Sequence, residues 1–97
     1  MPQLLRYTVI GRVQGVYFRE GAKAEAKKLG LGGYVRNDTD GAVRGEAVGE
    51  SSSIEAFTEW LRKGPERATV KDVQTSVEEV MDDQYQGVFE KVKNRRP

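Results

Sequence analysis

Residues 11–20 read GRVQGVYFRE, and this stretch joins a segment typical of a strand to a segment typical of a helix. Upstream of it, apolar side chains occupy alternate positions, which indicates a strand with one buried face. These positions are Leu5, Tyr7, Val9 and Val13. Downstream, apolar side chains recur every three or four positions, which predicts an amphipathic helix. These positions are Phe18, Ala22, Ala26 and Leu29, with Gly30 as the C-terminal cap.

A hairpin follows the first helix. Strands are predicted at Tyr34–Asn37 and Ala42–Val48, and the turn-forming residues 38–41 (DTDG) separate them. The second helix begins among the serines at 51–53 and ends at Gly64. Ser52 and Glu55 are spaced as a capping box at its start.

Two further strands complete the chain. Alternation at Val73, Thr75 and Val77 predicts one strand, and Gly87–Val92 predicts a short last one. The remaining residues, Lys93–Pro97, form a basic tail.

The order strand, helix, strand, strand, helix, strand predicts an α+β fold of the ferredoxin-like split βαβ type, with a short last strand added. Right-handed crossovers would place both helices on one face of an antiparallel sheet. The 97 residues fit a single domain over 1–97, with an ordered core at about 4–92.

Composition excludes several kinds of chemistry. The chain has no cysteine and no histidine, so thiolate catalysis, imidazole acid–base catalysis and the usual zinc ligand sets are unavailable. We expect no metal and no organic cofactor. The net charge of +1 gives no field that would attract nucleic acid or an acidic membrane. No apolar run approaches the ~20 residues of a membrane span, and we expect a cytoplasmic monomer.

The glycine loop and the helix that follows it suit an anion. Unpaired backbone amides and the helix dipole both favour negative charge at a helix N-terminus. Arg19 adds a planar fork of donors that matches phosphate oxygens. No side chain in the loop is a ready nucleophile, which leaves direct attack by water, and the Asn37 amide could position that water. Without an obvious general acid, the leaving group should depart readily as an anion, as a carboxylate does.

These residues resemble the two signatures of the acylphosphatase family. The first signature is matched by residues 11–19 and the second by Gly33–Asn37 with Gly41, Val43 and Gly49. The general similarity runs from about Tyr7 to Val92. Asp38 stands where many relatives have threonine.

The resemblance implies hydrolysis of an acyl phosphate to a carboxylate and inorganic phosphate. By position, Arg19 would bind the phosphate and Asn37 would orient the nucleophilic water. The loop whose amides help to bind the phosphoryl group would comprise Gln14, Gly15, Val16, Tyr17, Phe18 and Arg19. Inorganic phosphate would then be both the product and a competitive inhibitor.

Other interpretations of the same residues stay open. Taken alone, an arginine at a helix start is often only solvated, and an asparagine before a turn is often only a turn-former. A non-catalytic module could use the same loop to hold phosphate without turnover. A nucleic-acid-binding domain of this fold is disfavoured, because the closely spaced aromatic residues of RNA-recognition domains are absent and the charge is nearly balanced.

Overall fold

The computed structural model describes residues 2–80 and 88–92. Its elements are β1 (Gln3–Arg12), α1 (Phe18–Lys28), β2 (Gly32–Asn37), β3 (Val43–Gly49), α2 (Ser51–Lys63), β4 (Thr69–Glu79) and β5 (Phe89–Val92). No helix in these ranges is long and apolar enough to cross a membrane. The basic tail at 93–97 lies outside the described residues.

The strands form one sheet in the order β4-β1-β3-β2-β5. β1 pairs antiparallel with β3 and β4, and β2 pairs antiparallel with β3, which confirms the ferredoxin-like arrangement. β5 instead pairs parallel with β2, so the sheet is mixed and not antiparallel throughout. The reason is geometric. β4 runs opposite to β2 and ends where β2 begins, so a strand that returns to the free edge of β2 enters in the same direction as β2.

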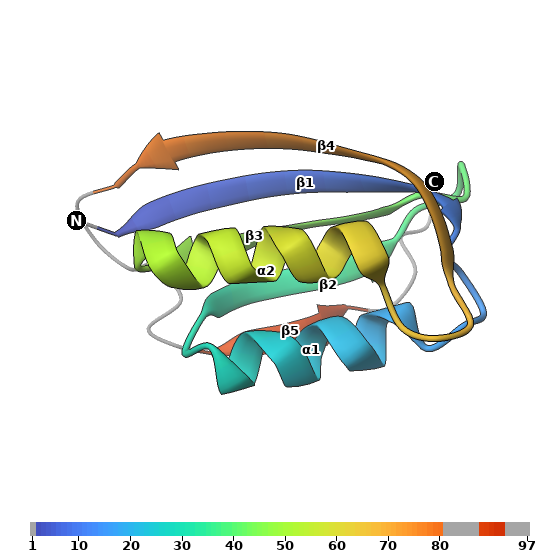
Figure 1. The fold of residues 1–97 in the computed structure, drawn as a ribbon, viewed down its shortest axis with the longest axis horizontal. Helices are drawn as coiled ribbons and strands as arrows, with labels where there is room; N and C mark the ends of the chain where they lie inside the picture. Colours follow the sequence, from blue (N-terminus) through green and yellow to red (C-terminus); the bar gives the residue numbers. More distant parts are fainter. Residues whose placement is uncertain (1, 81–87, 93–97) are drawn as a thin grey trace.

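Both helices cover one face of the sheet, as predicted (Figure 1). Three aromatic pairs between the layers pack edge to face, an arrangement that ring quadrupoles favour, and Phe57 and Trp60 are stacked. Phe57 of α2 lies between Tyr7 of β1 and Phe89 of β5, with ring centroids 5.7 and 5.8 Å apart. Phe18 meets Trp60 of α2 at 5.3 Å, and this contact joins the two helices. The start of α1 is therefore anchored in the core.

α1 starts at the first position of its predicted apolar pattern, whereas the start of α2 differs from the prediction. α1 begins at Phe18, so that Arg19 is its second residue. The predicted capping box at Ser52 and Glu55 is wrong, because α2 already begins at Ser51 with Glu50 as its N-cap and no side chain caps it. Because α2 starts almost directly after β3, all three serines lie in its first turn.

Candidate functional site

The candidate site lies where β1 and β2 both end. β1 and β2 are each antiparallel to β3, so they run in the same direction and their carboxyl ends lie at the same end of the sheet. The glycine loop leaves β1 there, and Asn37 is the last residue of β2. Residues far apart in the sequence are brought together by this topology.

A cavity of about 290 Å³ lies at this end of the sheet. It is lined by Val13, Gly15, Tyr17, Phe18, Arg19, Glu20 and Asn37. It therefore brings Arg19 together with Asn37 and with much of the predicted loop. Its volume is close to the lower end of the range for small-molecule sites, about 300 Å³.

The loop backbone is bent so that it leads directly into α1. Gly15 has φ of 72°, and Tyr17, the N-cap residue, has φ of 63°. The Tyr17 side chain makes no capping hydrogen bond. Because the first N–H groups of a helix have no partner within the helix, those of the first turn of α1 can donate to a ligand.

Arg19 stands in that same first turn. The helix dipole disfavours a cation there by about 0.3–1 kcal/mol. An anion held between the helix N-terminus and the guanidinium group would interact favourably with both. The position of Arg19 is therefore one that a bound anion would stabilise.

Two members of the predicted loop do not line the cavity. Val16 is buried in the hydrophobic core. The side chain of Gln14 reaches across to the β2–β3 turn, where its Nε2 donates to the carbonyl oxygens of Asp38 at 2.7 Å and Ala42 at 3.1 Å. Gln14 thus ties the loop to the turn that follows Asn37, a contact that the sequence did not reveal.

Asn37 is the one buried polar residue among those described, with 8% of its surface exposed. Its Oδ1 is buried and accepts no hydrogen bond from the described residues. Such an acceptor costs about 1–3 kcal/mol when it stays unpaired, and buried polar atoms without partners are rare in native proteins. Together with its place in the lining of the cavity, the unpaired oxygen makes Asn37 a candidate for a role in the site.

Charged side chains support the turn next to Asn37. Arg36 of β2 and Arg44 of β3 face each other in register, and like charges in such positions repel. Asp38 bridges them, with its carboxylate oxygens 2.7 Å from Arg36 and 2.6 Å from Arg44. Hydrogen bonds from Arg36 and then Arg44 lower the pKa of Asp38, so the carboxylate stays ionised. Arg44 also binds Asp40 at 2.8 Å.

Glu20 is a lining residue that sequence reasoning missed. Its carboxylate pairs with Lys91 of β5, and this hydrogen bond lowers the pKa of Glu20. The pairing partly offsets a negative charge beside Arg19. The only sign in the sequence that Glu20 lines the site was its position directly after Arg19, because its partner Lys91 is distant in the sequence.

A larger hollow of about 340 Å³ lies on the sheet around Arg6, Tyr34, Arg36 and Arg44. Each of the three arginines that line it is already paired with a carboxylate. It also lacks a loop of backbone amides. We therefore assign the chemistry to the smaller cavity.

Comparisons with known proteins identify the family to which the chain belongs. The family model described as Acylphosphatase matches residues 5–90. An acylphosphatase of Nitrosococcus oceani is 44% identical over 80 residues, which cover 82% of this chain and 90% of that protein. The structure of an acylphosphatase from Coxiella burnetii superposes with a TM-score of 0.84 at 38% identity, over 94% of this chain and 93% of that one. The acylphosphatase of Bacillus subtilis gives a TM-score of 0.85 at 34% identity, over 95% and 99% of the two chains. The chain therefore belongs to the acylphosphatase family of hydrolases and carries acylphosphatase activity.

Proposed function

We propose that this acylphosphatase cleaves acyl phosphates by direct attack of water, with Arg19 and the loop amides holding the phosphoryl group and Asn37 orienting the water. The observation that carries the proposal is that Asn37, whose buried Oδ1 has no hydrogen-bond partner among the described residues, lines the same cavity as Arg19. The mechanism needs no covalent intermediate and no cofactor.

The phosphoryl group fits the loop end of the cavity. Its oxygens can accept hydrogen bonds from the amides of the first turn of α1 and from the forked guanidinium group of Arg19. The amide donors are held in place by the helix backbone and by the packing of Phe18 in the core. Donors that are in place before the reaction stabilise charge in the transition state without reorganising.

The attacking water fits at Asn37. A water in the cavity can form a hydrogen bond with the side-chain amide of Asn37, and this bond fixes the direction of a lone pair of the water oxygen. Holding the nucleophile next to the phosphorus atom converts a bimolecular encounter into an oriented step. An amide performs this task without changing its protonation state, so it suits a chain that has no histidine.

The bonds and charges balance without a general acid. The water oxygen forms a bond to phosphorus while the bond from phosphorus to the acyl oxygen breaks. The bonding electron pair leaves with the carboxylate, and both protons of the water end on the phosphate. Because a carboxylate is a stable anion at neutral pH, the leaving group needs no proton.

The test is hydrolysis of benzoyl phosphate in the presence of EDTA. We expect Arg19→Lys to lose about 10- to 150-fold in kcat/KM, the equivalent of one charge-assisted hydrogen bond of 1.5–3 kcal/mol. Arg19→Ala should lose more. Arg62→Ala, which removes an exposed arginine of α2, is the matched control and should keep wild-type activity.

Asn37→Ala separates water positioning from phosphate binding. We expect kcat to fall about 100-fold, while the inhibition constant of inorganic phosphate stays within a few fold. Equal losses in both would mean that Asn37 binds the phosphoryl group and does not orient water. The unfolding free energy of the variant should be unchanged or higher, because a buried unpaired acceptor has been removed.

The proposed partner is a small acyl phosphate, and inorganic phosphate is expected to inhibit competitively. A cytoplasmic monomer without affinity for nucleic acid remains our prediction. If the folded wild type bound phosphate but failed to hydrolyse benzoyl phosphate, the non-catalytic anion-binding module would replace this proposal.

A further inference from the structure

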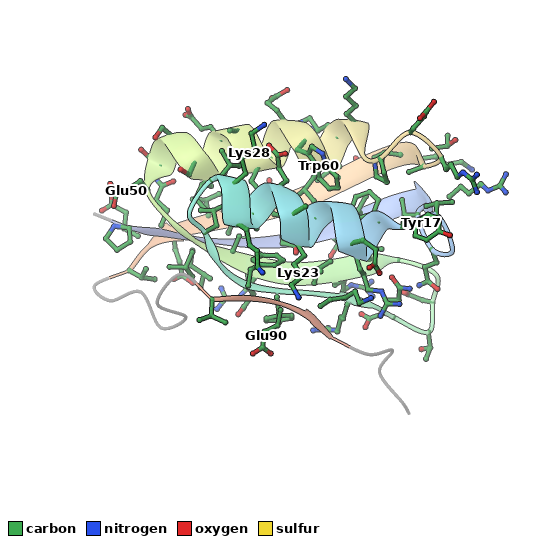
Figure 2. The ribbon with its side chains drawn as sticks, turned by 90° about the horizontal axis from the view of Figure 1, so that it is seen from below. Tyr17, Lys23, Lys28, Glu50, Trp60 and Glu90 are labelled. Atoms are coloured by element: carbon green, nitrogen blue, oxygen red, sulfur yellow. The ribbon has the colours of Figure 1, made fainter. Side chains whose placement is uncertain are left out.

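Tyr17 is the most exposed large apolar or aromatic side chain among the described residues, with 68% of its surface accessible. It nevertheless lines the cavity that holds Arg19 and Asn37. Figure 2 shows it beyond the end of α1 where the helix begins, far from Glu50. No described residue forms a hydrogen bond with its hydroxyl group. The fold therefore gains no hydrogen bond from this side chain, and most of the ring is accessible to a ligand.

The backbone at Tyr17 is also unfavourable for a tyrosine. It is the only residue other than glycine with positive φ in the described part of the chain, at φ 63° and ψ 27°. This left-handed conformation costs a side chain roughly 1–2 kcal/mol, whereas glycine adopts it freely and asparagine tolerates it. A strained conformation of this kind supports a hypothesis of function when it lies at a binding site.

One end of the cavity is buried and the other is open to solvent. Asn37 is 8% exposed and Tyr17 is 68% exposed, so Asn37 lies in the interior and Tyr17 at the rim. In phosphoryl transfer the attacking and leaving oxygens lie roughly in line on opposite sides of the phosphorus atom. If the water is held at Asn37, the acyl group leaves toward the open side, where Tyr17 stands.

We propose that Tyr17 is a specificity-determining residue that packs against the acyl group, and that the substrates preferred by this enzyme are acyl phosphates with an aromatic acyl group. This inference rests on the proposed function, because the direction of the acyl group follows from the position of the water. An aromatic ring can stack on Tyr17 or meet its edge, and such contacts add to the burial of apolar area. A methyl group offers little surface to the same ring.

The experiment compares benzoyl phosphate with acetyl phosphate in the wild type, Tyr17→Gly, Tyr17→Asn and Tyr17→Phe. Glycine and asparagine suit the backbone at this position, so these variants are expected to fold, which circular dichroism checks. The readout is the ratio of kcat/KM for the two substrates, because any change in the phosphoryl-binding loop affects both substrates alike. We expect this ratio to fall about 2- to 10-fold in Tyr17→Gly and Tyr17→Asn. It should stay within twofold in Tyr17→Phe, which keeps the ring.

A second readout does not depend on turnover. Phenacylphosphonate and acetonylphosphonate carry a methylene group in place of the bridging oxygen of benzoyl and acetyl phosphate, and calorimetry gives their affinities. We expect the preference for the phenacyl compound to be lost in Tyr17→Gly. If the wild type hydrolysed neither substrate but kept this Tyr17-dependent preference, the proposed function would fail and the contact with Tyr17 would stand. If both acyl phosphates were hydrolysed and neither ratio changed in Tyr17→Gly, the inference would be overturned.

Discussion

Replacing Gln14 by methionine should loosen the site by removing one side-chain amide. In the structure, Nε2 of Gln14 donates to two carbonyl oxygens of the β2–β3 turn, at 2.7 and 3.1 Å. Methionine has a similar length but no donor. The turn it releases follows Asn37 directly, so the change should affect both stability and catalysis.

The expected loss of stability follows from the two hydrogen bonds. Each typically contributes about 0.5–1.5 kcal/mol net. The carbonyl oxygens of Asp38 and Ala42 also accept backbone hydrogen bonds from Gly41 and Asp38, at 3.1 and 2.9 Å, so neither is left without a partner. We therefore expect a loss of about 1–2 kcal/mol in the unfolding free energy. For a domain of this size, 1 kcal/mol corresponds to roughly 4–8 °C in Tm.

Urea unfolding and differential scanning calorimetry measure this loss, and benzoyl phosphate hydrolysis measures catalysis. Gln74→Met is the matched control, because Gln74 is an exposed glutamine on β4. Gln14→Met should also lower kcat, by up to about 100-fold if Asn37 shifts by 1 Å. If Gln14→Met matched Gln74→Met in both stability and kcat, the hydrogen bonds of Gln14 would have no role in holding the loop to the turn.

Three further predictions concern stability. Inorganic phosphate at 100 times its dissociation constant should raise the unfolding free energy by about 2.7 kcal/mol, and Arg19→Ala should lose most of the corresponding Tm shift. The pKa of Asp38 is lowered in the folded protein. The ionised carboxylate therefore adds to the unfolding free energy above its unfolded pKa, near pH 4, and this stabilisation is lost as the pH falls through the folded pKa. The difference in unfolding free energy between wild type and Arg44→Gln, measured by urea unfolding, should narrow over that pH range. Gly33→Ala should destabilise by roughly 2–5 kcal/mol in the same assay, because a Cβ there would lie 2.0 Å from a backbone carbonyl oxygen of β3 at a φ of 132°. Gly30→Ala is the control, because a Cβ at that position meets nothing within 4 Å. This variant should lose only the unfolding free energy that the positive φ costs an alanine.

The fold could be predicted because local patterns and topology agree. Alternation in β1 correctly marks Leu5, Tyr7 and Val9 as buried. The direction of β5 could not be predicted, because four residues carry no signal for parallel or antiparallel pairing. The direction depends on where β4 ends relative to β2. The capping box failed because three consecutive serines offer several starts of similar energy, and the end of β3 decides between them.

The site was predictable only in part. Motif spacing identified Arg19 and Asn37, and the structure brings them into one cavity. Nothing in the sequence indicated that the side chain of Gln14 binds the β2–β3 turn, since the two segments are 24 residues apart. The bridge of Asp38 between two arginines depends on the register of β2 and β3, which the sequence does not specify.

The parallel direction of β1 and β2 explains why one small cavity can hold both parts of the proposed mechanism. The chain leaves β1 through the loop, returns along α1 and enters β2 at the far end, so β2 finishes next to the loop. The connectivity therefore places the N-terminus of α1 and the end of β2 at the same end of the sheet, where the proposed anion site lies. In the proposed mechanism, the side chains at that end of the sheet select the substrate. Asn37 lies in the interior, where it can hold only a small nucleophile, and Tyr17 lies at the rim, where a larger group can be accommodated. A change at the rim should consequently alter which acyl group is preferred without altering the bond that is broken.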